Sequence, residues 1–403
     1  MPMEGEAISD SYIVVLKDHV DSTQALGHCS WVSDMSSSIT TGKARNDYFL
    51  DSEALMGIQY TYDSPTWRGY SGKFSSETLE HIRRSPDVAY VEHDSMVYTS
   101  EMQRNAPWGL ARISHRNALS LSTFNKYPHK GQGGEDVKVY VIDTGINVKH
   151  HDFEGRAEWG ITIPENEADE DGNGHGSHCA GTIAGKRFGV AKKARPVAVK
   201  VLRSNGSGSM SGVLAGVNWA TEQHQLDASR AGHKYKGSVA NMSLGGGRSN
   251  ALNMAVNEAV KSGMVFAVAA GNDNRNACQY SPAGAENAIT VGASNIRDER
   301  AYFSNHGPCV DVFAPGENIL SVWNSGPDST NTISGTSMAS PHVAGLAAYF
   351  VSLAENNGTQ PVDPKKIKQQ ILDLATRDKL SNLPKDTTNL LIYNDGESLA
   401  MLQ

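Results

Sequence analysis

Three short glycine-rich motifs constrain this chain more than any other feature, because each sets one reactive side chain beside a strongly apolar segment. The motif VIDTG contains Asp143, GNGHGSHCAGTIAG contains His175, and SGTSMASPHVAG contains Ser337. An acid, a base and a hydroxyl are the parts that acyl transfer through an activated serine requires. Their order along the chain is informative, because the same three residue types occur in other orders on unrelated folds.

Each motif also predicts its own local structure. The run from Val137 to Ile142 is β-branched and apolar, as in a buried parallel strand, and Asp143 ends it. In open α/β sheets the ligand crevice lies beyond the carboxyl ends of the strands, so we expect Asp143 at such a crevice. The apolar stretches after His175 and Ser337 predict helices. A nucleophile at a helix N-terminus lies in a field that favours developing negative charge.

A fourth motif, AVAAGN, predicts a strand from Met264 to Ala269 and a glycine turn that ends at Asn272. The amide of Asn272 can donate a hydrogen bond. One such donor aimed at a tetrahedral oxyanion contributes about 10²–10³ in turnover. We interpret Asn272 as this donor, and the alternative is a turn residue that tolerates unusual backbone angles.

Taken singly, each of the first three motifs has a simpler explanation. VIDTG alone is a strand followed by a turn, and GTS alone is a helix cap. His175 and His178 are three residues apart, but Cys179 and Asp171 do not complete a plausible zinc ligand set. Three long matches in a fixed order favour the catalytic interpretation.

With these motifs the chain is identified as a member of the subtilase family. It resembles the proteinase K subfamily and, within it, the vacuolar proteases of the cerevisin group and the mould vacuolar serine protease allergens. Further matching stretches are NAPWGLARISHR (105–116), GVAKKA (189–194), AVKVLRSNGSG (198–208), NMSLGGG (241–247), DERAYFSN (298–305) and VDVFAPG (310–316). The resemblance covers residues 105–395. It implies a serine endopeptidase of broad specificity with the catalytic residues Asp143, His175 and Ser337, and Asn272 at the oxyanion.

The resemblance also implies how substrate binds. Two glycine-rich segments would flank an extended peptide that adds as a strand between them. The expected contacts are Gly206, Ser207, Gly208, Ser243, Leu244, Gly245, Gly246, Ala269, Ala270 and Gly271. The last six of these would line the S1 pocket, and none is charged, so we expect a preference for apolar or aromatic P1 residues. The alternative for each glycine segment is a simple turn.

The fold class follows from the alternation of apolar strands with amphipathic helices. For residues 101–403 we predict an α/β peptidase domain, a subtilisin-like parallel sheet with helices on both faces. Residues 1–100 give the order βαββαβ, which is the α+β ferredoxin-like split unit. This unit resembles the inhibitor and chaperone propeptide of subtilases. Its alternative is an independent small domain without a role in activity. A linker is expected from Asp94 to Ala106, with self-cleavage at Ser100–Glu101.

The four cysteines are too few for a disulfide scaffold. The resemblance pairs Cys278 with Cys309 and leaves Cys179 as a free buried thiol. Cys29 belongs to the propeptide and is expected to stay free.

Calcium is the one cofactor that the resemblance implies, as a structural ion, and no catalytic cofactor is expected. The carboxylate of Asp311 and the backbone carbonyls of Glu286 and Ala288 match the ligands of a calcium site. Oxygen-only ligands suit calcium. The alternative is that Asp311 is an ordinary surface carboxylate. A second calcium site is not expected, because Arg116 and Lys379 occupy its ligand positions.

The composition excludes two classes of binding partner. A net charge of −8 gives no basic footprint for nucleic acid, and no apolar run approaches the length of a membrane-spanning helix. The resemblance implies a monomer that acts on peptides and proteins, with its own propeptide as intramolecular inhibitor. The start MPMEGEAISDSYIVVLK lacks the features of a signal peptide, although the vacuolar location that the resemblance implies requires one. Of the sequons at Asn205, Asn241 and Asn357, the last is the best glycosylation candidate.

Two alternatives to a vacuolar protease remain at this point. One is a catalytically silent subtilase that its propeptide occupies permanently, although all four catalytic residues are present. The other keeps the same chemistry in a secreted digestive enzyme.

Overall fold

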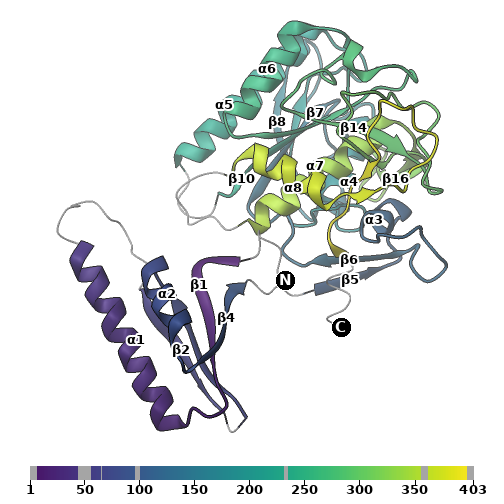
Figure 1. The fold of residues 1–403 in the computed structure, drawn as a ribbon. Helices are drawn as coiled ribbons and strands as arrows, with labels where there is room; N and C mark the ends of the chain where they lie inside the picture. The colour runs from purple at the N-terminus through teal and green to yellow at the C-terminus, as the bar shows by residue number, and fades with distance from the viewer. Residues whose placement is uncertain are drawn as a thin grey trace. The chain divides into compact units, whose positions relative to one another are not determined.

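The computed structural model describes residues 7–43, 56–64, 66–95, 100–230, 235–354 and 362–396. The chain divides into two compact units, residues 1–98 and 99–403, and each is described by itself (Figure 1).

The first unit is a four-stranded antiparallel sheet with two helices. Its elements are β1 (Ala7–Leu16), α1 (Ser22–Lys43), β2 (Gly57–Asp63), β3 (Arg68–Lys73), α2 (Ser76–Arg84) and β4 (Val88–Ser95). The strand order β2-β3-β1-β4 is that of a ferredoxin-like split unit, as predicted. Helix α2 begins where the Ser75 hydroxyl accepts a hydrogen bond from the Thr78 N–H. Helix α1 spans 22 residues.

The second unit is built on a nine-stranded sheet in the order β18-β19-β15-β14-β12-β10-β7-β9-β8. Neighbouring strands are parallel except for the terminal pair β18 and β19. The strands are β7 (Val137–Asp143), β8 (Glu158–Thr162), β9 (Arg195–Lys200), β10 (Gly237–Met242), β12 (Val265–Ala269), β14 (Ile289–Ser294), β15 (Val312–Pro315), β18 (Thr376–Arg377) and β19 (Leu390–Leu391). The predicted α/β class and parallel sheet are confirmed.

Helices cover both faces of this sheet (Figure 1). They are α3 (Trp108–Ile113), α4 (His175–Ala184), α5 (Met210–Arg230), α6 (Asn250–Lys261), α7 (Thr336–Leu353) and α8 (Pro364–Leu374). Side chains of a strand alternate between faces. Val139 and Val141 of β7 therefore join the core with α4, α7 and α8, while Tyr140 and Ile142 join the core with α5 and α6. Among the described residues, no helix is long and apolar enough to cross a membrane.

The predicted linker is partly structured. Strand β4 continues to Ser95, and β5 (Ser100–Arg104) pairs antiparallel with β6 (Lys126–Lys130). The polar composition of this stretch gave no strand signal, because the strand is held by backbone pairing rather than by an apolar face. The smaller pairs β11 (Gly246–Gly247) with β13 (Tyr280–Ser281), and β16 (Ile319–Val322) with β17 (Thr330–Ile333), complete the strands.

Candidate active site

Three neighbouring strands of the large sheet end at one place. The strands β7, β10 and β12 lie side by side. Strand β7 ends at Asp143, Ser243 directly follows β10, and Asn272 lies three residues after the end of β12. The helices α4 and α7 begin at the same place, with His175 as the first residue of α4 and Ser337 as the second of α7. Carboxyl ends of parallel strands and helix N-termini together are a common setting for ligand sites.

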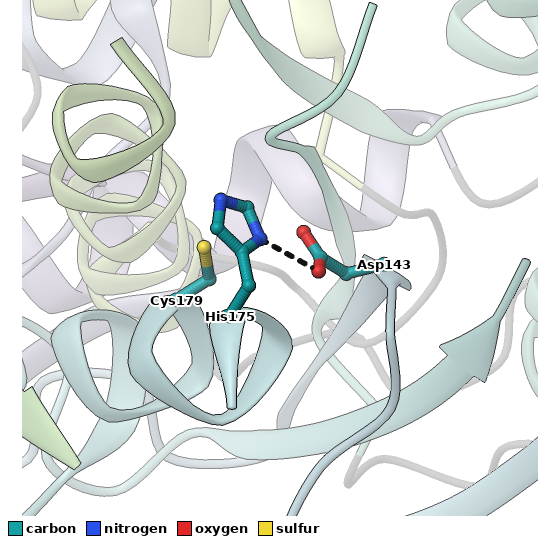
Figure 2. A group of neighbouring side chains, drawn as sticks. All are labelled: Asp143, His175 and Cys179. Atoms are coloured by element: carbon teal, nitrogen blue, oxygen red, sulfur yellow. Dashed lines mark hydrogen bonds and ion pairs between the residues drawn. The ribbon is translucent and has the colours of Figure 1, made fainter. Parts of the chain in front are cut away.

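Asp143 and His175 form a buried pair. The Nδ1 of His175 lies 2.8 Å from Oδ1 of Asp143 (Figure 2). Oδ1 also accepts from the N–H of Thr144 at 2.7 Å, whereas Oδ2 is buried without a hydrogen-bond partner. Burial lowers the pKa of His175, but the charge of Asp143 and the hydrogen bond to it outweigh burial and raise the pKa overall. The pair therefore stabilises the imidazolium, and no hydrogen bond within the described ranges involves the second ring nitrogen.

A second carboxylate holds the His175 turn in place. Asp171 accepts hydrogen bonds from the Thr144 hydroxyl at 2.8 Å and from the N–H groups of Asn173 and Gly174. Its other oxygen accepts from the N–H and the hydroxyl of Ser177 at 2.9 and 2.6 Å. Five donors on one buried carboxylate fix the first turn of α4 against the end of β7. From the sequence, Asp171 was a candidate only for a zinc ligand set, which it does not complete.

The glycines of the first two motifs let these segments meet. A side chain on Gly176 would collide with the carbonyl oxygen of Gly145, and Gly145 itself has a left-handed φ of 113°. Close approach of α4 to the β7 turn brings His175 within hydrogen-bonding distance of Asp143.

Ser337 is tied to the strand end beside it. Its hydroxyl donates to the carbonyl of Ser243 at 3.0 Å, and the Ser243 hydroxyl donates to the carbonyl of Ser337 at 2.8 Å. In the described part of the chain, no hydrogen bond joins the Ser337 hydroxyl to His175. A hydrogen bond from the Ser337 hydroxyl to the histidine would replace the one to the Ser243 carbonyl. Its backbone N–H is among those at a helix start that lack an intrahelical acceptor.

Asn272 is oriented by a residue that the sequence analysis did not single out. Its Oδ1 accepts from the N–H and the hydroxyl of Thr336, at 2.8 and 2.9 Å. The Thr336 hydroxyl in turn accepts from the N–H of Gly271 at 3.1 Å. With its oxygen held in this way, exposed Asn272 presents its NH₂ group to solvent as a free donor. The signal for Thr336 was its place between Gly335 and Ser337.

A cavity of about 480 Å³ opens beside His175. Seven of the ten residues predicted to bind substrate line this cavity, namely Gly206, Ser207, Gly208, Ser243, Leu244, Gly245 and Gly246. Ala269, Ala270 and Gly271 are not among its lining residues, and the two alanines are buried. The apolar wall includes four side chains that the sequence analysis did not assign: Leu202, Met210, Val213 and Leu252.

Cys179 lies one helical turn after His175. One potential ligand atom from each of Asp143, His175 and Cys179 lies within 4.8 Å of the others (Figure 2). Burial raises the pKa of the Cys179 thiol well above its usual range, and the thiol donates to the carbonyl of Ser337 at 3.3 Å. A thiol that remains protonated is a poor metal ligand and a poor nucleophile.

The remaining cysteines and the sequons complete the predicted positions. A disulfide joins Cys278 and Cys309, whose Cα atoms are 5.3 Å apart, and Cys29 is free. Asn241 is buried in β10, Asn205 is exposed, and Asn357 lies outside the described residues.

The groups expected to bind calcium surround the ammonium group of a lysine side chain. The ammonium of Lys368 in α8 donates to the carbonyls of Glu286 and Ala288 at 3.2 and 2.7 Å. It also lies 2.9 and 3.0 Å from the two carboxylate oxygens of Asp311. These residues as arranged do not fit a calcium ion, because Lys368 holds all three ligand groups.

Comparisons with known proteins agree with this geometry. Residues 134–392 match the Subtilase family, and residues 11–100 match Peptidase inhibitor I9. The chain is similar to Subtilisin-like serine protease Pen ch 18 of Penicillium rubens, with 57% identity over 98% of this chain and 82% of the relative. Alkaline protease 2 of Aspergillus fumigatus is 55% identical over 98% of this chain and 83% of its own length.

A solved structure shows the same likeness. The crystal structure of a cold adapted subtilisin-like serine proteinase matches with a TM-score of 0.63 and 46% identity, over 72% of this chain and 98% of that one.

Proposed function

Since this chain belongs to the subtilase family and is a serine endopeptidase, we propose that Ser337 is its nucleophile, His175 its general base and Asp143 the group that orients the histidine. The observation that carries this assignment is the 2.8 Å contact between His175 Nδ1 and buried Asp143, beside the N-terminus of the helix that holds Ser337. It leaves the second ring nitrogen as the proton acceptor.

The reaction runs in two halves. Ser337 Oγ forms a bond to the scissile carbonyl carbon as its proton moves to Nε2 of His175, and the carbonyl oxygen becomes an oxyanion. The histidine then gives that proton to the leaving amine as the C–N bond breaks, which leaves an acyl-enzyme. Water repeats the sequence, with its proton passing through His175 to Ser337, and releases the acid. The NH₂ of Asn272 and the N–H of Ser337 would donate to the oxyanion in both halves.

Substrate selection follows from the cavity lining. Backbone groups of Gly206–Gly208 and Ser243–Gly246 would pair with an extended peptide. The neighbouring apolar side chains would favour apolar or aromatic residues of the substrate, including the P1 residue, and the enzyme would have broad specificity. Peptide libraries that vary one substrate position at a time measure this preference, and a preference for charged P1 residues would contradict it.

An I9 inhibitor domain in the same chain implies intramolecular inhibition. We propose that Ser337 itself releases this domain by cutting Ser100–Glu101, which divides the chain into residues 1–100 and 101–403. Ser100 pairs with Lys130, and Glu101 with His129, in the β5–β6 ladder. Because both residues are paired in the uncut chain, they would have to leave this ladder to reach Ser337 before the cut.

The resemblance further suggests a monomeric vacuolar glycoprotein, with secretion as the alternative location. Imaging of the tagged native gene product would separate vacuole from medium. Mass spectrometry of the native protein would show whether Asn357 carries a glycan.

A serine-directed phosphonyl reagent tests the catalytic assignment. The processed enzyme should hydrolyse a chromogenic peptide, and the reagent should abolish turnover with a single adduct that maps to Ser337. A matched control is Ser340, which is buried three residues along the same helix and should carry no adduct. Full activity of the fully labelled enzyme would contradict the proposal.

A further inference from the structure

The ammonium of Lys368 sits where two loops and a helix meet. Glu286 and Ala288 belong to the segment before β14, Asp311 directly precedes β15, and Lys368 lies in the middle of α8. The ammonium has three protons, and its contacts of 2.7–3.2 Å reach two carbonyls and the carboxylate. Both charged side chains are partly buried, at 20% and 25% exposure for Lys368 and Asp311.

The Lys368 ammonium compensates the negative charge of Asp311, as a metal ion would. Burial raises the pKa of Asp311, and the charge of Lys368 opposes that rise. The carboxylate also accepts from the N–H of Thr290 at 2.8 Å. Two inward-facing carbonyls beside a partly buried carboxylate make a concentrated negative site, which requires a cation of some kind.

We propose that Lys368 takes the place of the structural calcium ion at this position, so that the chain supplies its own cation and binds calcium there only when the lysine is removed. A metal ion at the centre of these oxygens would coincide with the ammonium. On this proposal, Asp311, Glu286 and Ala288 would not bind calcium while Lys368 is present.

A second basic side chain, at the C-terminal end of α8, supports the replacement of calcium by protein cations. Arg116 stands at a position where the resemblance places a ligand of the second calcium site. Its guanidinium lies 2.5 Å from the carbonyl of Leu374, the last residue of α8, and 3.7 Å from the centre of the Tyr393 ring. One protein cation thus projects from the middle of α8, and another contacts the carbonyl at its end.

The substitution has a consequence for the fold. Ile367 and Ile371 bury one face of α8 in the core, and Lys368 fastens the adjacent face to the segments before β14 and β15. A tethered ammonium cannot be removed by a chelator, and it does not depend on the calcium concentration of the surroundings.

Thermal unfolding of the full chain tests the proposal without interference from proteolysis if every variant also carries Ser337→Ala. The parent should have the same Tm in excess EDTA and in millimolar calcium. Lys368→Ala should lower the Tm in EDTA by about 5 °C, because it leaves the carboxylate unpaired. Calcium should recover most of that loss. Lys366→Ala, on an exposed neighbour in the same helix, should behave as the parent.

Asp311→Asn separates this site from others. Added to Lys368→Ala, it should abolish the calcium-dependent rise in Tm. The proposal is overturned if calcium raises the Tm of the parent and Asp311→Asn removes that rise, or if calcium fails to stabilise Lys368→Ala. Should Lys368→Ala not fold, equilibrium dialysis of the parent against radioactive calcium decides: binding that Asp311→Asn eliminates overturns the proposal, and its absence supports it.

Discussion

Asp143 and Asp311 are both carboxylates at the ends of strands in the large sheet, and each faces a basic side chain from a helix. His175 uses one ring nitrogen on Asp143 and keeps the other unbonded, with 26% of its side chain exposed. Lys368 directs its ammonium to a carboxylate and two carbonyls. On the proposed assignments, the first pair is catalytic because its histidine keeps one titratable nitrogen for the substrate. The second pair is structural because protein oxygens bind the ammonium group.

The largest expected contrast comes from neutralising each carboxylate in turn. Asp143→Asn should lower kcat by about 10⁴-fold, because the histidine loses the partner that fixes its tautomer and stabilises its charged form. The Tm should change little. The variant would be processed in trans by tagged wild-type enzyme, which is then removed before peptide hydrolysis is measured. A loss of less than tenfold would contradict the role given to this pair.

The next effect concerns the oxyanion donor. Asn272→Ala should lower kcat by about 10²–10³-fold with little change in KM, because the NH₂ group acts on the transition state. Thr336→Val removes the hydroxyl that holds the Asn272 oxygen and should give a smaller loss of kcat. Steady-state kinetics on one chromogenic peptide measure both. An effect confined to KM would mean that Asn272 binds substrate rather than the transition state.

For the structural pair the expected effect is on stability. Asp311→Asn in the processed enzyme should lower the Tm by about 5 °C and leave kcat unchanged below the melting range. Differential scanning fluorimetry and peptide hydrolysis on the same preparation check the two parts. A fall in kcat with no change in Tm would contradict a structural role for the Asp311–Lys368 pair.

The smallest effect is a shift in pH dependence. The net effect of its surroundings raises the pKa of His175, so the base is protonated, and inactive, to a higher pH than an ordinary histidine. Activity should rise with pH through this pKa, and the midpoint of kcat/KM should lie above about 6.5. Asp143→Asn should move the midpoint to lower pH. A midpoint that the substitution leaves unchanged would show that another group controls the profile.

The sequence analysis predicted the parts of the site that short segments encode. Strand β7 and the helix after His175 are apolar runs bounded by glycine, and these patterns predicted their positions within a few residues. What it missed depends on contacts between distant segments. Thr336 donates a hydrogen bond to Asn272, which is 64 residues away in the sequence. A hydrophobic repeat along the chain cannot predict a hydrogen bond between such distant residues.

Lys368 illustrates the same limit more strongly. It lies 57 residues from Asp311, in a helix with two other lysines, Lys365 and Lys366. Composition cannot tell which of the three faces the strands. The resemblance supplied the calcium ligands correctly as a cluster of oxygens, but it could not show that this chain fills the cluster with its own cation.

We propose that Ser337, activated through His175, performs the peptide-bond cleavage of this enzyme, including its own. The most direct measurement is the intact mass of freshly expressed wild type and Ser337→Ala, purified side by side with no other protease present. The account predicts two fragments for wild type, separated at Ser100–Glu101, and a single uncut chain of 403 residues for Ser337→Ala. Cleavage of Ser337→Ala at the same bond would contradict it.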